Sequence, residues 1–422
     1  MTRRTALPWP HWSLGRDASL LVAGQAVRAA GYGSTAVLLG ALLAARGYSH
    51  LRAGIVLTAI IAGTALASLV VGALADRVGR RRSYGAFYLT VAVAGAVVAA
   101  GAPYWALLVV ALTGALSTDV VDNGPATTLE QAMLAAEDAS TARVYGVYNA
   151  VGAGAGALGA LATALPGQSG GSGSGGVSAG LFVVLVPVGV VGALLASRLS
   201  TAVEVSAEPI TMTKAGSARS RLGPSRQVVH HLAALFALDA AGGGLVTTGF
   251  LSYLFAQRYH ATITSLGWLF FTVAVVQTIS VALAPRLTRR FGLVATMVGT
   301  HLPSNLLLAS IAFAPTFGVA VALLLARTTL SQMDVPTRQA LVMTAVTPAE
   351  RTAAAAVTNA ARYTVRPLGP LVAGLVQQVS LGAPLLVAGT VKAGYDLALW
   401  RFARHLLPPR AGHSAAATAE AS

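Results

Sequence analysis

The chain has 422 residues, of which 55% are hydrophobic and only 10% are charged, and its mean hydropathy is +0.68. A soluble domain carries about 25% charged residues, so this chain cannot cover a water-exposed surface and we expect lipid to be its main solvent. The absence of cysteine excludes disulfides and thiolate metal sites. The net charge is +15, and the basic residues lie between the apolar runs, a position that indicates membrane topology rather than a nucleic-acid partner.

The apolar runs are long enough to cross a membrane as helices, since spanning takes about 20 apolar residues. The first run passes Ala45 without a cleavage site, so it is too long for a signal-peptide core and is expected to stay in the membrane. The runs are continuous rather than alternating, which favours helices over a barrel. In chain order, twelve candidate spans lie near 18–45, 51–75, 84–101, 104–124, 143–165, 178–198, 229–257, 262–285, 291–313, 315–334, 352–378 and 384–403.

Two polar segments suggest how these spans are organised. A basic stretch with Pro209 and Pro224 divides the spans into two groups of six, and the glycine- and serine-rich residues 167–176 form a flexible outer loop. We therefore expect four parts: a first six-helix half at 1–198, a cytoplasmic linker at 199–228, a second six-helix half at 229–410 and a disordered tail at 411–422.

The basic residues predict the orientation. With the N-terminus inside, 21 of the 29 basic residues fall in cytoplasmic segments, whereas the outer loops hold only Arg46, Arg52 and Arg258. Because cytoplasmic loops are enriched in Lys and Arg, both termini are predicted to be cytoplasmic. The excess of Arg over Lys, with abundant Ala and Gly, indicates a bacterial source and hence a multi-pass protein of the inner membrane.

The two halves resemble each other at a nearly constant offset. The matches are Arg28 with Asp239, Pro125 with Pro336, Asn149 with Asn359, Gly159 with Gly369, and Arg77 with Arg286, all 209 to 211 residues apart. Such spacing indicates an internal duplication. Transporters built from parallel repeats place their substrate site between the two halves.

A motif between the second and third spans carries a family resemblance. The segment Gly72-Ala-Leu-Ala-Asp76-Arg77-Val-Gly79-Arg80-Arg81-Arg82 resembles the signature loop of the major facilitator superfamily. The resemblance implies an all-α integral membrane fold of twelve transmembrane helices in two pseudo-repeat halves. It also implies a gating loop formed by Gly72, Asp76, Arg77, Gly79, Arg80 and Arg81, whose contacts change between access states. The alternative is a loop whose basic residues only set topology.

The resemblance extends over the chain but is incomplete. The strings that begin at Glu130, Asp334 and Glu350 look like those of a poorly characterised prokaryotic branch. In the second half, the matching loop Leu283–Arg290 has Pro285 at the position of Asp76. The fourth span lacks the usual arginine of the family and carries aspartates, so a simple copy of the proton relay of drug exporters is not expected.

Ionisable residues inside spans are costly, about 2.5–3.5 kcal/mol each at a helix centre, and are usually functional or paired. The repeat places Arg28 and Asp239 at equivalent depth, where they either pair across a central cavity or are satisfied separately. Lys392 and Asp396, four residues apart, are expected to form a structural pair along one helix. The candidates for substrate binding or coupling are Arg28, Asp119, Asp122, Asp239, Arg327, Arg362 and Arg366.

Arg362 and Arg366 are four residues apart and share one helix face. If they face a cavity, they favour an anionic substrate. If they lie near the cytoplasmic end, they are membrane anchors. The sequence contains no phosphate-binding loop, and we expect neither an enzyme activity nor a metal or cofactor. We therefore predict a monomeric secondary transporter that uses alternating access, with proton-coupled efflux of a drug or metabolite as its function. The alternative is a non-transporting membrane receptor or scaffold on the same fold.

Overall fold

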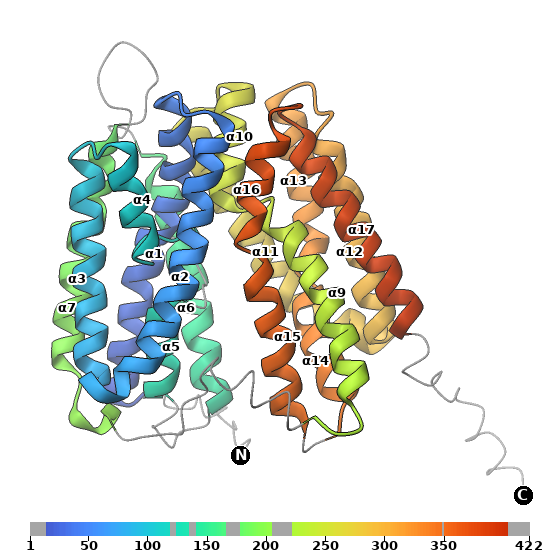
Figure 1. Ribbon diagram of the computed structural model, residues 1–422, viewed down its shortest axis with the longest axis horizontal. Coiled ribbons are helices and arrows are strands. Elements are labelled where there is room, and N and C mark those ends of the chain that lie inside the picture. Colours follow the sequence, from blue (N-terminus) through green and yellow to red (C-terminus); the bar gives the residue numbers. More distant parts are fainter. Residues whose placement is uncertain are drawn as a thin grey trace, which may run out of the picture.

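The structure is a computed structural model that describes residues 14–118, 124–134, 141–165, 178–204, 222–347 and 350–403. These residues form helices and no strands, arranged as two bundles side by side (Figure 1). The first bundle contains α1 (Arg16–Ala45), α2 (His50–Val78), α3 (Arg80–Ala99), α4 (Tyr104–Leu112), α5 (Pro125–Leu134), α6 (Thr141–Ala162), η1 (Ala179–Val184), α7 (Leu185–Arg198) and η2 (Thr201–Glu204).

The second bundle contains α9 (Arg226–Gly244), α10 (Thr248–Tyr259), α11 (Ile263–Phe291), α12 (Leu293–Ile311), α13 (Phe317–Ser331), α14 (Asp334–Thr344), α15 (Arg351–Val365), α16 (Leu368–Val376) and α17 (Ala383–Ala403). Seven described helical segments are long and apolar enough to cross a membrane. Each of the twelve predicted spans corresponds to one helix or to two successive helices, so the predicted fold class is confirmed.

In each half, a break separates the helix of the fourth predicted span from a further helix, α5 or α14, that the predicted spans did not include. In the first half, α4 ends at Leu112, just before Gly114, which has a φ of +72°. Gly114 also lies close to α2, since a Cβ added to it would be 2.7 Å from the Cβ of Ala67. A positive φ is strained for residues other than glycine, so this residue permits the break. In the second half, α13 and α14 are separated by Gln332 and Met333.

Single glycines connect the second and third spans of each half. Gly79 lies between α2 and α3 with a φ of +102°, and Gly292 lies between α11 and α12 with a φ of +89°. The predicted second-half loop Leu283–Arg290 is not a loop, because α11 continues through Pro285 to Phe291. The turn at Gly292 is therefore the structural counterpart of the turn at Gly79.

Close packing also follows the repeat. A Cβ on Gly159 of α6 would overlap the carbonyl oxygen of Ala30 in α1, and a Cβ on Gly369 of α16 would overlap the backbone of Gly244 in α9. Since small residues let helix backbones touch within a membrane, the matched glycines pack the fifth predicted span of each half against its first.

The two halves contact each other near the end at which α1 finishes and α2 begins. A Cβ on Gly40 would overlap the carbonyl oxygen of Gly249 in α10, and the hydroxyl of Ser252 donates to the carbonyl of Val37 at 2.6 Å. Tyr253 in α10 donates to the carbonyl oxygen of Tyr48 at 3.0 Å. Toward the opposite end, where α1 begins and α17 ends, the ribbons of the two bundles diverge (Figure 1).

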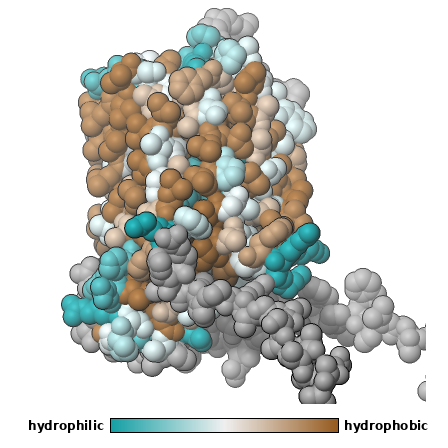
Figure 2. Space-filling model, turned by 90° about the vertical axis from the view of Figure 1, so that its right-hand side faces the viewer, coloured by the Kyte–Doolittle hydropathy of each residue, from teal (hydrophilic) through white to brown (hydrophobic). Residues whose placement is uncertain are grey.

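The outer surface fits a membrane. Figure 2 shows a broad hydrophobic band across the face, with hydrophilic residues gathered toward its upper and lower ends. Large apolar side chains such as Leu66, Val93 and Leu194 are more than half exposed. Lipid accounts for such a continuous apolar exterior, which monomeric soluble proteins rarely show.

Candidate functional site

A buried charged network joins four helices of the first half. Arg28 in α1 forms an ion pair with Glu130 in α5, with Nη2 and Oε2 2.7 Å apart. Glu130 also accepts hydrogen bonds from Tyr84 in α3, at 2.5 Å, and from Tyr148 in α6. We call Arg28, Tyr84, Thr127, Glu130 and Tyr148 the N-half cluster.

Further hydrogen bonds support the ion pair of the N-half cluster. The carboxylate of Glu130 has three donors, and the guanidinium of Arg28 also donates to Gln25 and, at 3.2 Å, to Thr127. Arg28 and Glu130 are 1% and 0% exposed. Additional hydrogen bonds stabilise a buried ion pair, and here they reach the carboxylate of Glu130 and the Nη2 atom of Arg28, whereas the Nε atom of Arg28 is buried without a partner among the described residues.

A second network occupies the other half. Asp239 in α9 pairs with Lys392 in α17 and with Arg338 in α14, at 3.3 Å. Arg338 also pairs with Asp334, one turn earlier in α14, at 2.8 Å. These groups are buried, so their charges compensate one another out of contact with bulk water.

Histidine extends this second network. The Nδ1 atom of His301 in α12 lies 2.7 Å from a carboxylate oxygen of Asp396 in α17, and its Nε2 atom lies 3.9 Å from Asp239. Asn305 donates to Asp396 at 2.8 Å. We call Asp239, His301, Asn305, Asp334, Arg338, Lys392 and Asp396 the C-half cluster. The imidazole ring of His301 thus lies between two carboxylates.

One pairing that the sequence left open does not form, and one expected pairing is wrong. Arg28 and Asp239 do not pair, because each has a partner of opposite charge within its own half. Lys392 pairs with Asp239 rather than with Asp396, whose nearest partners are His301 and Asn305. In both cases a partner on a neighbouring helix replaces the one that the sequence suggested.

The two clusters are related by the repeat with inverted charge. At the offset that matches Pro125 with Pro336, Thr127 corresponds to Arg338. In the first half a cation on α1 faces α5, and in the second half an anion on α9 faces α14. The helices that hold the repeat-matched prolines, α5 and α14, thus each supply an ion partner, to Arg28 and to Asp239 respectively.

The signature loop is held within the first half. Glu204 in η2 accepts hydrogen bonds from the backbone N–H groups of Arg80, at 2.6 Å, and Arg81, at 3.1 Å. A carboxylate stabilises the free N–H groups and the positive end of a helix N-terminus, so Glu204 caps α3. Gly72, Asp76 and Arg77 lie in α2, and the side chain of Asp76 is outside the described part of the chain.

The remaining candidates divide into three groups. Asp119 and Asp122 lie outside the described residues. Arg366 follows α15 directly. Arg327 in α13 and Arg362 in α15 form neither an ion pair nor a hydrogen bond with any described residue, and the Nε atom of each is buried without a partner.

Sequence reasoning missed Tyr84, Tyr148 and His301, and it placed Arg338 in a cytoplasmic segment. Their helices bring them to Glu130, Asp239 and Asp396 only when the bundle forms. The usable signal was the pair of repeat-matched prolines, since ionisable residues follow both: Glu130 lies after Pro125, and Arg338 lies after Pro336.

Comparisons with known proteins agree with this architecture. The family model described as "Major Facilitator Superfamily" matches residues 21–370. An uncharacterized membrane protein of the yeast Saccharomyces cerevisiae is 25% identical over 91% of this chain and 93% of its own length.

Solved structures share the fold at low identity. A mutant of the nucleoside transporter NupG has a TM-score of 0.72 at 14% identity, covering 93% of this chain and 100% of that one. The inward open xylose transporter XylE from E. coli has a TM-score of 0.66 at 15% identity, covering 94% and 97%. The human organic anion transporter MFSD10 has a TM-score of 0.60 at 17% identity, covering 92% and 100%.

Proposed function

Because this chain belongs to the major facilitator superfamily, a family of secondary transporters rather than enzymes, we propose that it moves a small solute across the membrane by alternating access. The observation that carries the proposal is the packing of the halves. They contact each other near one end, while each half keeps a buried charged cluster of its own. Rocking one half against the other would expose a central site to each side in turn.

The contact between the halves would be the closed gate of one state. Gln257 in α10 donates to the carbonyl oxygen of Ala44 in α1 at 3.4 Å. The orientation proposed from the basic residues puts this contact on the outer side and makes the described state inward-facing. An exporter would load its substrate in that state, and on this ground we propose efflux from a bacterial cell, with both termini in the cytoplasm.

Counterflow in proteoliposomes loaded with a metabolite mixture tests transport. The chain has no native cysteine, so Ala44→Cys combined with Gln257→Cys can be crosslinked across the gate. Crosslinking should abolish counterflow, and reduction should restore it, whereas either single variant should be unaffected. Solute binding without counterflow in the uncrosslinked protein would favour the receptor or scaffold alternative.

We propose the proton as the coupling ion, with His301 as its site. Asp239 already pairs with two cations, Lys392 and Arg338, whereas the ring of His301 lies between Asp239 and Asp396. His301→Gln should remove transport driven by a pH gradient and retain counterflow, which needs no net proton movement. Unchanged gradient-driven transport in His301→Gln would exclude this residue as the coupling site.

We propose that the signature loop is part of a second gate, at the cytoplasmic end. Asp76→Asn should impair transport while the amount of folded protein in the membrane stays unchanged, because it removes one charge from a contact that forms in only one state. Arg82→Gln, in the same basic segment, serves as a control for a general loss of charge. Equal transport kinetics for Asp76→Asn and the unmodified chain would reduce the loop to a topology signal.

A further inference from the structure

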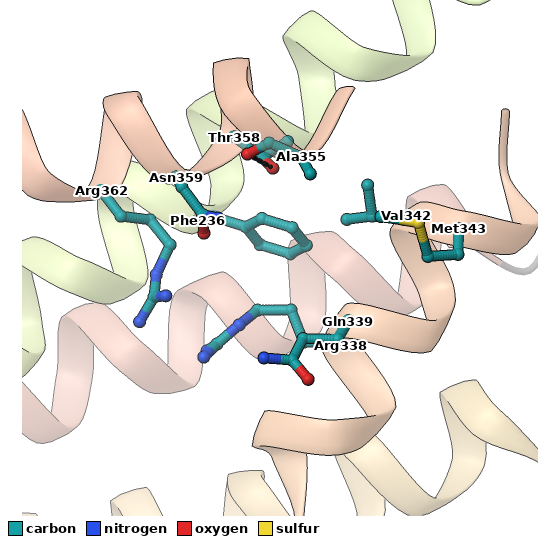
Figure 3. Close-up of a pocket in the computed structure, with 9 residues that line it drawn as sticks. All are labelled: Phe236, Arg338, Gln339, Val342, Met343, Ala355, Thr358, Asn359 and Arg362. Atoms are coloured by element: carbon teal, nitrogen blue, oxygen red, sulfur yellow. Dashed lines mark hydrogen bonds between the residues drawn. The ribbon is translucent and has the colours of Figure 1, made fainter. Parts of the chain in front are cut away.

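A pocket in the second half is lined by side chains from three helices. Its cavity volume is about 70 Å³, and α9, α14 and α15 form its walls. Ligand pockets have volumes of about 300–1,000 Å³, so in this state the pocket admits only a compact ligand that also occupies its open mouth. Figure 3 shows the ring of Phe236 at its centre, with the guanidinium groups of Arg338 and Arg362 at one end and Val342 and Met343 at the other.

The two guanidinium groups at this pocket differ in how they are compensated. Arg338 has two carboxylate partners, Asp334 and Asp239, and lies 5.8 Å from the centroid of the Phe236 ring. Arg362 has no ion partner among the described residues, and its Nε atom is buried without a hydrogen-bond acceptor. A buried donor that lacks an acceptor is unfavourable, and more so when it is charged.

The charges of the second half leave a positive excess around the pocket. The second half has four cationic side chains in this region and three carboxylates. The cations are Arg327, Arg338, Arg362 and Lys392, and the carboxylates are Asp239, Asp334 and Asp396. Arg338 pairs with Asp239 and Asp334, and Lys392 pairs with Asp239. The N-half pair of Arg28 with Glu130 is balanced by contrast. Among the described residues, the second-half network therefore carries one positive charge in excess, whereas the N-half pair carries none.

The shape of the guanidinium group selects the kind of anion. Arginine donates two parallel hydrogen bonds to a carboxylate or phosphate, which fixes the ligand's orientation. The opposite end of the pocket is apolar, and Thr358 and Asn359 offer neutral polar groups along its wall. A ligand that matches both ends carries an anionic head and a compact apolar body.

We propose that this pocket binds the carboxylate of a small aromatic or aliphatic organic anion, with Arg362 as its main ion partner and Phe236 against its apolar part. This inference rests on the proposed transport function and names the substrate class. It places the substrate head in the second half, while the balanced N-half cluster serves as the structural counterpart.

Binding to the purified full-length protein tests the inference separately from transport. Titration calorimetry in detergent compares benzoate with benzamide and benzylamine, which have similar shapes and different charges. Benzoate should bind more tightly than both. Arg362→Gln should weaken benzoate binding about tenfold or more, because it removes charge-assisted hydrogen bonds. Arg401→Gln, at an exposed position near the end of α17, should leave the affinity unchanged.

Arg362→Lys guards against a folding defect, since it retains the charge and loses the paired donor geometry. It should bind benzoate more weakly than the unmodified chain and more tightly than Arg362→Gln. Equal binding of benzoate and benzamide, or equal benzoate affinity in all Arg362 variants, would overturn the inference even if counterflow is observed. Selective benzoate binding without counterflow would overturn the transport function and leave the anion site standing. Inhibition of benzoate binding by inorganic phosphate would assign the site to oxyanions in general, and no inhibition would restrict it to carboxylates.

Discussion

The ion pair of Arg28 and Glu130 predicts strong energetic coupling between α1 and α5. The two side chains are 1% and 0% exposed, and their charged atoms are 2.7 Å apart. Removing one member of a buried pair costs about 3–5 kcal/mol, because the other charge stays desolvated without its partner. Arg28→Met should therefore lower the free energy of unfolding by this amount. For Glu130→Gln, the loss of unfolding free energy should lie at the lower end of this range, since the amide oxygen of the new glutamine can still accept a hydrogen bond from Tyr84 or Tyr148.

The double variant Arg28→Met with Glu130→Gln removes both charges. Its loss should be close to that of one single variant, which corresponds to a coupling energy of about 3 kcal/mol. Arg28→Met combined with Asp239→Asn should instead be additive within about 0.5 kcal/mol, because the two residues share no partner. The assay is reversible unfolding of the purified protein in mixed detergent micelles, followed by circular dichroism.

Arg401→Met is the matched control, as an arginine at an exposed position, and it should change the free energy of unfolding by less than about 0.5 kcal/mol. Additive losses for Arg28 and Glu130 would refute the reasoning about the N-half cluster. A coupling energy above about 1 kcal/mol between Arg28 and Asp239 would show that the halves exchange these partners.

Three further predictions concern the turns, the loop carboxylates and the topology. Gly79→Ala should destabilise the protein by about 1 kcal/mol or more in the same unfolding assay, because the φ of Gly79 is +102° and the new Cβ would lie 3.3 Å from Glu204. Gly154→Ala is the control: no atom lies near the new Cβ on α6, so this variant should be neutral or stabilising. Hydrogen bonds from the hydroxyls of Ser225 and Thr347 and from the backbone of Gly223 hold the pKa of Glu350 below its usual range. The ionised form of Glu350 therefore stabilises the fold at pH values above the pKa of this group in the unfolded chain, and this stability is lost as the pH falls through the lower pKa of the folded state. Glu350→Gln should flatten the acid limb of a plot of unfolding free energy against pH. An unchanged acid limb would contradict this prediction. Ser172→Cys should react with an impermeant thiol reagent from outside the cell and Ser217→Cys should not, and the reverse labelling would invert the orientation.

The sequence determined the class of structure because solvation depends on composition and on local pattern. A chain with 10% charged residues and twelve long apolar runs has to satisfy its backbone within each segment, and helices do so in lipid. The duplication was also visible, since Pro125 with Pro336 and Gly159 with Gly369 keep one spacing. These signals are carried by neighbours along the chain, and they need no knowledge of which helices touch.

Only the tertiary structure decided which charges are partners. Arg28 and Asp239 were correctly singled out as residues inside spans, yet their matched depth said nothing about the helices beside them. Lys392 has a carboxylate one turn away in Asp396 and still pairs with Asp239 on another helix. The choice of partner depends on how α1 packs near α5 and how α9 packs against α17, because an ion pair in a low-dielectric interior needs contact within a few ångströms. That packing also leaves Arg362 without an ion partner among the described residues, which no linear pattern distinguishes from the paired arginines.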